Sequence, residues 1–149
     1  MQANKDSLRL GNQLCFPIYL CSKEIIRKYG PLLREFNLTY RQYIVMMYFW
    51  ERRQSNVRDL SKALLLDPST LTPLLVKLET KGYVTRVKSK LDRRNLDVAI
   101  TDEGAKLEER ALSVPGVMRK CIDLPEDELM VLNKLIYKVL NNIERNEIK

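Results

Sequence analysis

The chain has 149 residues, 45% hydrophobic and 30% charged, which is enough for one compact domain with a buried core. It contains no histidine, so Ser-His and Cys-His catalytic pairs and Cys₂His₂ zinc sites are excluded. Its three cysteines, Cys15, Cys21 and Cys121, are not spaced as a CxxC metal knuckle. Metal enzymes and ordinary hydrolases are therefore disfavoured, and we expect no cofactor.

The chain carries no targeting or membrane signal that we can identify. No apolar run approaches the length of a membrane span, and the N-terminus MQANKDSLRL lacks the apolar core of a signal peptide. We therefore predict a cytoplasmic protein with no membrane partner. Thiols are reduced in that compartment, and an odd number of cysteines argues against a structural disulfide framework.

The first forty residues are expected to be helical. Apolar residues recur at helical spacing over 8–29, and Pro17 predicts either a kink or a helix start close to Cys15. Gly30-Pro31 is expected to end this helix, with a short second helix over 32–36.

A capped, buried helix and a helix pair are expected next. Thr39 is a plausible N-cap for an apolar helix over 40–53. The following helix would bury one apolar face, and the helix after it begins with Asp67 as cap and Pro68 at its first position, with Gly82 as its stop. The residues of that apolar face are Val57, Leu60, Leu64 and Leu65.

The second half of the chain predicts a hairpin and two helical segments. Alternation over 83–89 and 95–101 indicates two strands joined by the charged KLDRR. A helix over 101–121 would be capped by Thr101 and broken at Pro115-Gly116. The last helix, over 124–146, has an apolar stripe that needs a partner surface, which predicts a homodimer. The stripe is Leu129, Leu132, Leu135, Ile136, Val139, Leu140 and Ile143.

Positive charge is concentrated on the predicted hairpin. The net charge of the chain is +7, and residues 81–94 hold six basic residues against one acid, Asp92. The order helix, turn, helix, basic hairpin is that of a winged helix-turn-helix, a mainly α fold with a small β-hairpin wing that binds double-stranded DNA. An ordinary helix pair with a solvated hairpin remains the alternative. The candidate DNA contacts are Ser69, Thr70, Thr72 and Lys77 on the reading helix and Arg86, Lys88, Lys90, Asp92, Arg93 and Arg94 on the wing.

One segment resembles a known DNA-binding family. LDPSTLTPLLVKLETKGYVTRVKSKLDRRNLDVAITDEG is similar to the winged helix-turn-helix core of the MarR family, whose wing signature Asp-x-Arg-Ser/Asn matches 92–95. The resemblance implies that Arg94 reaches into the minor groove and that Asp92 braces it. It also implies a single domain over 1–149, with dimerisation helices over about 8–36 and 102–147, a DNA-binding lobe over about 39–101, and a pseudo-palindromic operator.

The N-terminal segment narrows the resemblance to the OhrR and SarZ branch of thiol-based oxidation sensors. NQLCF and LDPSTLTPLL are similar to that branch, although Pro68-Ser69 replaces its Ser-Gly pair and Arg93 replaces an acid. The resemblance implies that Cys15 is the peroxide-reactive thiolate and that Cys121 forms a disulfide with Cys15 of the second subunit. Three tyrosines would surround the thiolate, partly from the second subunit: Tyr19, Tyr29 and Tyr40.

The residues alone leave the thiols open. An unpaired cysteine in an apolar helix is usually a buried small hydrophobe, which applies to Cys15 and to Cys21. Tyr19 lies one helical turn after Cys15 and is a candidate donor to its sulfur, whereas Tyr29 lies about 21 Å along the helix and would reach it only in trans. Cys21 is about 9 Å along the helix from Cys15, too far for a disulfide, so we expect a packing role. Cys121 is equally compatible with a surface or interface thiol.

These observations predict a homodimeric DNA-binding repressor, not an enzyme, released from its operator when organic hydroperoxide oxidises Cys15. A regulator switched by a small aromatic ligand and a SarZ-like global redox regulator are alternatives. A thiol peroxidase is a weaker one, because it gives the basic wing no role. A structural protein that uses its last helix as an interaction module would not bind duplex DNA at all.

Overall fold

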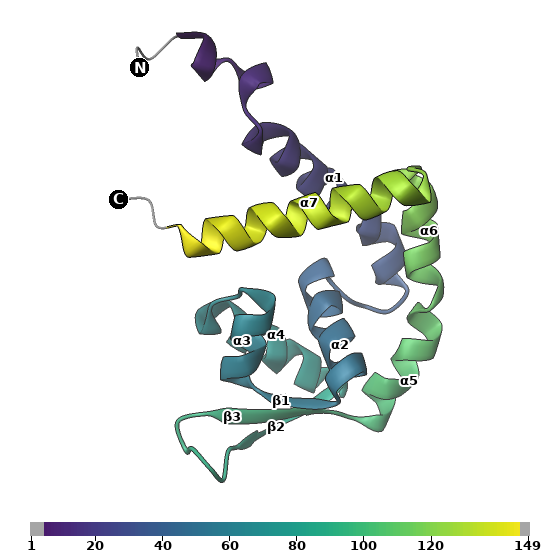
Figure 1. The fold of residues 1–149 in the computed structure, drawn as a ribbon. Helices are drawn as coiled ribbons and strands as arrows, with labels where there is room; N and C mark the ends of the chain where they lie inside the picture. Colours follow the sequence, from purple (N-terminus) through teal and green to yellow (C-terminus); the bar gives the residue numbers. More distant parts are fainter. Residues whose placement is uncertain (1–4, 147–149) are drawn as a thin grey trace. The chain divides into compact units, whose positions relative to one another are not determined.

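The computed structural model describes residues 5–146 (Figure 1). The chain forms two compact units, which divide after Val114. Within the described range no helix is long and apolar enough to cross a bilayer, and no group of three or more acidic or cysteine side chains is placed to hold a metal ion. The elements are two 3₁₀ helices, η1 (Lys5–Leu8) and η2 (Leu10–Asn12), the helices α1 (Cys15–Arg34), α2 (Tyr40–Arg52), α3 (Val57–Leu64), α4 (Pro68–Thr80), α5 (Asp102–Ala111), α6 (Ser113–Ile122) and α7 (Glu126–Arg145), and the strands β1 (Gln54–Asn56), β2 (Val84–Lys88) and β3 (Leu96–Ile100).

Helix α1 is longer than expected. It begins at Cys15, which confirms the prediction of a start next to Pro17. The prediction that Gly30-Pro31 ends the helix is wrong, because α1 continues to Arg34 with Pro31 inside it. Pro31 removes one helical hydrogen bond close to the end of the helix, and the last turn is held by packing, since Leu33 is only 1% exposed.

Helix α2 is the centre of the core. Thr39 caps it as predicted: its hydroxyl accepts a hydrogen bond from the backbone N–H of Gln42 (3.3 Å), and the Gln42 side-chain oxygen accepts one from the Thr39 N–H (3.0 Å). Helices α1, α4 and α5 contact α2. The buried residues of α2 are Gln42, Tyr43, Val45, Met46, Phe49 and Trp50.

Helices α3 and α4 form the predicted pair, with one correction. Leu65 lies beyond the end of α3 in the left-handed conformation (φ 49°) and is 57% exposed, so it is not part of the buried face. Pro68 opens α4, and Asp67 occupies the cap position without a side-chain cap bond. Gly82 (φ 78°) stops the helix, because its N–H donates to the Glu79 carbonyl (2.8 Å) while the next N–H donates to the Leu78 carbonyl (3.0 Å).

The predicted hairpin is confirmed, and a third strand joins it. The antiparallel sheet has the order β1-β3-β2, with Val98 paired to Arg86 on one side and to Ser55 on the other. Strand β1 was not predicted because Gln-Ser-Asn is short and polar and has no alternation. Buried Val84 and Val98 attach the sheet to the core.

The break after α5 lies three residues earlier than expected. Thr101 caps α5 as predicted, accepting a hydrogen bond from the Gly104 N–H (3.0 Å). The chain breaks at Leu112, and Pro115-Gly116 lies in the first turns of α6. The N–H groups in the first turn of a helix have no partner within the helix, so the missing N–H of proline costs nothing there. Pro115 therefore favours a helix start and not a break.

Helix α7 confirms the last predicted helix. Position 147 of the expected dimerisation segment lies outside the described residues. Three acids stand in the first turn of α7, where the helix dipole favours them, and within the same unit Arg119 pairs with Glu126. The predicted apolar stripe is present, but α7 contains no buried residue.

Candidate functional site

The start of the reading helix α4 presents short polar side chains. Ser69 and Thr72 are exposed and Thr70 is half-buried, while Lys77 is exposed two turns further along. The Thr72 hydroxyl donates to the Pro68 carbonyl (2.8 Å), which leaves its oxygen lone pairs outward as acceptors. The N–H of Thr70 already donates to the Asp67 carbonyl (2.9 Å), so the side-chain hydroxyls at this helix N-terminus are the groups suited to contacts with phosphates and base edges.

The tip of the wing is an ordered turn over residues 89–95. The hydroxyl of buried Ser89 accepts hydrogen bonds from the N–H groups of Leu91 (3.3 Å) and Asp92 (3.5 Å). The Ser89 N–H donates to the Asn95 carbonyl (3.0 Å), which closes the turn. The basic side chains at the tip therefore stand on a defined backbone.

Asp92 stabilises this turn through the backbone. Its carboxylate accepts a hydrogen bond from the N–H of Arg94 (3.0 Å), and no ion pair of the Arg94 guanidinium is found within residues 5–146. The Arg94 side chain is exposed. An open hollow in the wing is lined by Lys88, Ser89, Lys90 and Arg93, so three cations face the same space.

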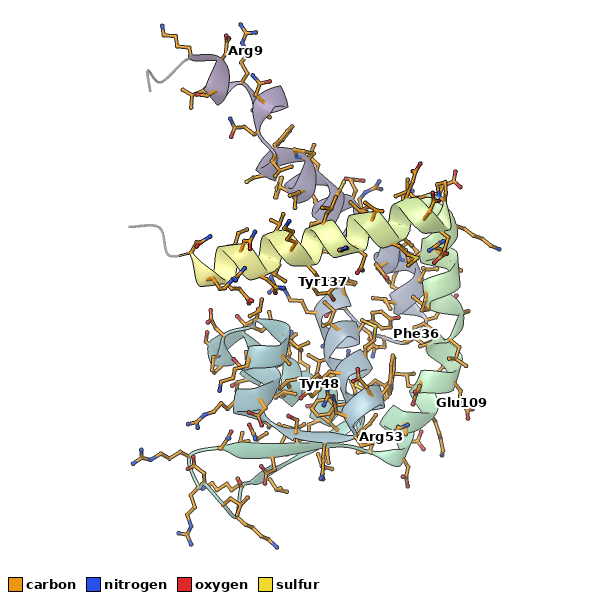
Figure 2. All side chains as sticks on the ribbon, viewed as in Figure 1. Arg9, Phe36, Tyr48, Arg53, Glu109 and Tyr137 are labelled. Carbon is orange, nitrogen blue, oxygen red and sulfur yellow. The ribbon has the colours of Figure 1, made fainter. Side chains whose placement is uncertain are left out.

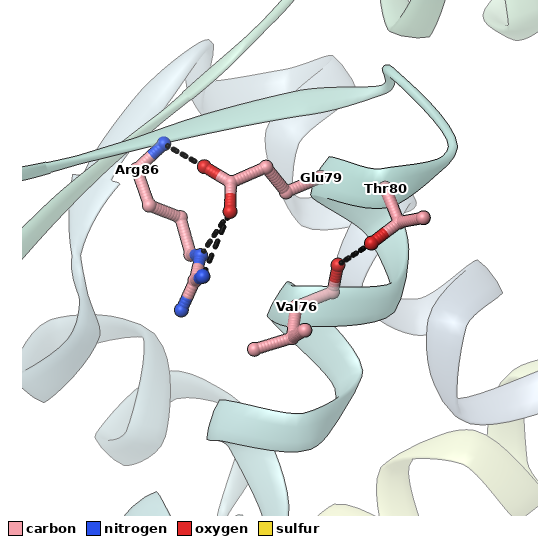
Figure 3. Close-up of polar contacts among 4 residues, drawn as sticks. All are labelled: Val76, Glu79, Thr80 and Arg86. Carbon is pink, nitrogen blue, oxygen red and sulfur yellow. Dashed lines mark hydrogen bonds and ion pairs between the residues drawn. The ribbon is translucent and has the colours of Figure 1, made fainter.

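Arg86 is already engaged with the reading helix (Figure 3). Its Nε (3.0 Å) and Nη2 (2.7 Å) donate to Oε2 of Glu79, and its backbone N–H donates to Oε1 (3.1 Å). These hydrogen bonds lower the pKa of the Glu79 carboxyl. The pair joins β2 to the last turn of α4, where Thr80 also donates to the Val76 carbonyl (2.9 Å). Contact of Arg86 with DNA stays a prediction.

All three thiols are free and exposed in the chain. Cys15 is the first residue of α1, so it lies beside the unpaired N–H groups of a helix start. The expectation that Cys21 is buried is wrong, because the first half of α1 contributes nothing to the core and its only buried residue is Leu33. Cys121 is the second-last residue of α6, in the unit 115–149.

The three predicted tyrosines fall into two places. Tyr19 is 61% exposed and makes no hydrogen bond with Cys15 in the structure, so its thiol-supporting role stays a prediction. Tyr29 and Tyr40 come together, with ring centroids 4.7 Å apart. Tyr43, which the sequence did not indicate as part of this group, contacts Tyr29 (5.7 Å between ring centroids) and Tyr40 (6.5 Å) with tilted rings. Its place in the apolar pattern of α2 indicated only a core residue.

Burial dominates the electrostatics of this tyrosine cluster. It raises the pKa of Tyr29 and of Tyr40, and it raises the pKa of Tyr43 to about 12, with smaller contributions from the two neighbouring tyrosines. The phenols are therefore neutral at physiological pH, and each keeps a proton that it can donate in a hydrogen bond.

Two helices carry exposed apolar faces. Leu14, the N-cap of α1, is exposed, and α1 itself exposes Ile18, Tyr19, Leu20 and Ile26. Helix α7 exposes Leu132, Leu135, Ile136, Leu140 and Ile143 of its predicted stripe, and Tyr137, labelled in Figure 2, is also exposed. A shallow groove along α7 is lined by Leu124, Asp127, Glu128, Val131, Leu132 and Leu135. Apolar patches of this kind mark interaction surfaces.

Comparison with known proteins shows which family has this arrangement. The model of the transcriptional regulator SarA/Rot family matches residues 27–110. The organic hydroperoxide resistance transcriptional regulator of Bacillus subtilis is 34% identical over 145 residues, covering 97% of this chain and 99% of that protein. The regulator SarZ of Staphylococcus saprophyticus is 41% identical over 132 residues, covering 89% and 90%.

Solved structures of AbfR, a protein of Staphylococcus epidermidis, have the same fold. Reduced AbfR bound to DNA superposes with a TM-score of 0.77 at 32% identity, covering 93% of this chain and 97% of AbfR. Disulfide-formed AbfR gives 0.64 at 31% identity, covering 95% and 97%. The winged-helix fold of the MarR type predicted from the sequence is thereby confirmed.

These relatives are transcriptional regulators and not enzymes, so the thiol peroxidase alternative loses its basis. The chain belongs to the SarA/Rot family of winged-helix transcriptional regulators and is of the type that includes the hydroperoxide-resistance regulator, SarZ and AbfR.

Proposed function

We propose that the protein is a homodimeric repressor that binds a pseudo-palindromic DNA operator and leaves it when organic hydroperoxide oxidises Cys15. The observation that carries this proposal is a free, exposed Cys15 at the start of α1, in a chain similar over nearly its whole length to an organic hydroperoxide resistance regulator.

The DNA contacts follow from the two exposed surfaces described above. Helix α4 would enter the major groove by its N-terminus, with Ser69, Thr70 and Thr72 at base edges and phosphates. Lys77 and the cations of the wing hollow would contact the phosphate backbone, and Arg94 would reach into the minor groove. Arg86, held by Glu79, would position the wing relative to α4 as it contacts the DNA backbone.

The dimer is supported by the exposed apolar faces. Helix α7 has a seven-residue stripe and no buried residue, and the first half of α1 is exposed in the same way. Each Å² of apolar surface removed from water contributes roughly 25 cal/mol of stabilising free energy. The matching faces of a second copy could cover these surfaces in a symmetric dimer. Two reading helices related by a two-fold axis would then bind two half-sites.

The oxidation step consumes one hydroperoxide. The Cys15 thiolate attacks the terminal oxygen of the hydroperoxide, the O–O bond breaks, and the alkoxide leaves and is protonated to the alcohol. Cys15 becomes a sulfenic acid. The thiolate of Cys121 from the second subunit then attacks this sulfur and forms the disulfide, while the S–O bond breaks and hydroxide leaves and is protonated by solvent to water. Tyr19, together with Tyr29 and Tyr40 of the second subunit, would donate hydrogen bonds to the thiolate before it reacts.

The disulfide is the better candidate for the releasing form. AbfR has been solved in an overoxidized form bound to DNA and separately in a disulfide form. In that protein, therefore, an oxidised thiol by itself is compatible with DNA binding. A disulfide joins two segments covalently and must move them, which is a larger change than adding oxygen to one sulfur.

A wider redox regulator of the SarZ type is the second candidate, because the SarZ of Staphylococcus saprophyticus is 41% identical. The same thiol chemistry would serve both. A regulator of one resistance gene would bind few promoters, whereas a global regulator would bind many, so the number of oxidant-sensitive sites across the genome separates them.

The test is a gel shift on the promoter region of the protein's own gene, before and after stoichiometric organic hydroperoxide. The wild-type complex should dissociate, and Cys15→Ser should keep its DNA. Cys21→Ser is the matched control, since Cys21 is exposed on the same helix. A wild-type complex that survives oxidant, or a Cys15→Ser protein that still releases DNA, contradicts the proposal.

The role of Cys121 has its own test. Non-reducing electrophoresis of the oxidised protein should show a cross-linked dimer that Cys121→Ser abolishes. An undiminished dimer band in Cys121→Ser would remove this residue from the mechanism.

A further inference from the structure

Three consecutive carbonyl groups after α1 are bound by side chains from distant parts of the chain. The Glu35 carbonyl accepts from Nη2 of Arg110 (3.2 Å), and the Phe36 carbonyl accepts from the hydroxyl of Tyr83 (3.4 Å). The Asn37 carbonyl accepts from Nζ of Lys81. Arg110 also stands over the Phe36 ring, 5.4 Å from its centroid (Phe36 is labelled in Figure 2). The negative end of the α1 dipole favours these two cations.

Lys81 has the most central position of the three. It is the C-cap residue of α4, and its ammonium also donates to Oε1 of Gln42 (3.0 Å). Gln42 is 2% exposed, and the same oxygen accepts the Thr39 N–H that caps α2. One charged group therefore joins the end of α1, the start of α2 and the end of α4.

The partial burial of Lys81 indicates that its contacts with Asn37 and Gln42 are more than an incidental surface interaction. Burial, and to a smaller extent the neighbouring Lys77, lower the pKa of the Lys81 ammonium, so holding the charge there has a cost. The two fixed acceptors offset this cost. A lysine whose only role was solubility would extend into water.

The same two helices carry the two ends of the proposed switch. Helix α1 is continuous over 20 residues, about 30 Å, with Cys15 as its first residue and the Lys81 acceptor just after its last turn. Helix α4 has the DNA-reading side chains at its start and Lys81 at its end. All of these residues lie in the unit 1–114.

We propose that Lys81 is the positioning residue that couples α1 to the reading helix, so that a displacement of α1 after thiol oxidation moves α4 on the DNA. This inference rests on the proposed function. Lys81 does not touch DNA in it; the residue sets where α4 stands.

The first measurement compares DNA affinity in the reduced and in the hydroperoxide-oxidised state for wild type and Lys81→Met. Coupling between two sites typically changes affinity 5- to 150-fold. We expect the ratio of the two dissociation constants to fall by about fivefold or more in Lys81→Met, while Cys15 is oxidised as fast as in wild type. Lys106→Met is the matched control, because Lys106 is an exposed lysine that pairs with Glu103 one turn earlier on α5.

The second measurement separates positioning from direct phosphate contact. Each lost phosphate contact lowers the slope of log K against log salt by about 0.9. Lys81→Met should weaken binding by the reduced protein without changing this slope, whereas Lys88→Met, in the wing hollow, should lower it. A lower slope in Lys81→Met would make Lys81 a DNA contact and overturn the proposal.

A structural role alone is tested by rescue. Lys81→Arg keeps a charged donor and should restore most of the ratio, and Lys81→Gln serves if Lys81→Met does not fold. If folded Lys81→Met or Lys81→Gln keeps the wild-type ratio of the two dissociation constants, the coupling role is refuted. The control Lys106→Met should keep the wild-type ratio in either case. Failure of the wild-type protein to bind DNA would instead refute the proposed function, and the coupling role with it.

Discussion

The DNA-reading lobe, defined here as residues 33–114, and helix α7 contain similar proportions of apolar residues. The lobe buries many of its apolar side chains, whereas α7 exposes them. From Leu33 to Val114 the chain supplies nearly all of the buried hydrophobic residues, including five side chains of α2 and three of α4. Helix α7 has seven apolar residues on one face and buries none. The lobe is complete within one chain, whereas α7 has a surface that needs a partner.

The polar contacts show the same contrast. In the lobe, charged side chains tie distant elements together: Glu79 holds Arg86 of the wing, and Lys81 holds the loop after α1. The polar contacts of α7 join residues close in sequence, such as Arg119 with Glu126 and Arg145 with Asn142. We therefore expect changes in the lobe to act on folding and changes in α7 to act on assembly.

The largest effect is expected from a charge on the α7 stripe. Ile136→Glu places a carboxylate on the exposed apolar face, where Ile136 is 52% exposed in the single chain. In a dimer this charge would be buried without a partner, so the dimer should dissociate. Because linked sites gain roughly 10²–10⁴ in avidity, DNA affinity should fall by a factor in that range. Sedimentation equilibrium and a gel shift measure the two effects.

Asn141→Glu is the control for that prediction. The substitution adds the same charge, but position 141 lies on the side of α7 opposite the apolar stripe. It should leave the dimer intact. A wild-type protein that sediments as a monomer at micromolar concentration, or an Ile136→Glu protein that remains dimeric, would contradict the assignment of α7 to assembly.

A smaller effect, on folding, is expected at Gly104. A Cβ there would overlap the Tyr83 carbonyl oxygen and lie 2.9 Å from Cγ1 of Ile100, while Trp50 Nε1 donates to the Gly104 carbonyl (2.9 Å). Backbone cannot give way as a side chain can. Gly104→Ala should therefore lower the free energy of unfolding by about 1–3 kcal/mol, the usual cost of overpacking. Urea unfolding followed by tryptophan fluorescence measures it.

Gly30→Ala is the matched control, because Gly30 lies inside α1 and a Cβ there meets nothing within 4 Å. Alanine in a helix interior should stabilise the protein by roughly 0.5–1 kcal/mol. Equal effects of the two substitutions would mean that the close packing of α5 against Tyr83 is not maintained in solution.

The elements that the sequence predicts well are those with local signals. The cap at Thr39, the pair Asp67-Pro68 at the start of α4 and the stop at Gly82 each act within four residues, and the structure has all of these boundaries. The helical spacing of the apolar residues over 124–146 likewise predicts α7. These features depend on backbone conformation and helical periodicity, which neighbouring residues determine.

The features that were missed depend on distant partners. Strand β1 exists because β3 pairs with it, and α1 continues past Pro31 because Leu33 is buried. Nothing near Lys81 in the sequence indicates that its ammonium meets Asn37 and Gln42. Tyr43 could be assigned to the core from its apolar neighbours, but its ring contact with Tyr29 depends on the packing of α1 on α2. The resemblance indicates site residues by their position in the sequence, and it carries no information on these long-range contacts.

The smallest effect appears only at high pH and tests whether the lobe holds its tyrosine cluster in solution. The pKa of Tyr43 is raised from its usual 10 to about 12. Stability from its neutral form is therefore fully present below pH 10 and is lost as the pH rises through 12. In a tyrosinate absorbance titration, wild type should show a late component that Tyr43→Phe removes, whereas Tyr137→Phe, a change on exposed α7, should leave it in place. A late component that persists in Tyr43→Phe would place the buried phenol elsewhere, and the lobe would then differ from its packing in this structure at the point where α1 meets α2.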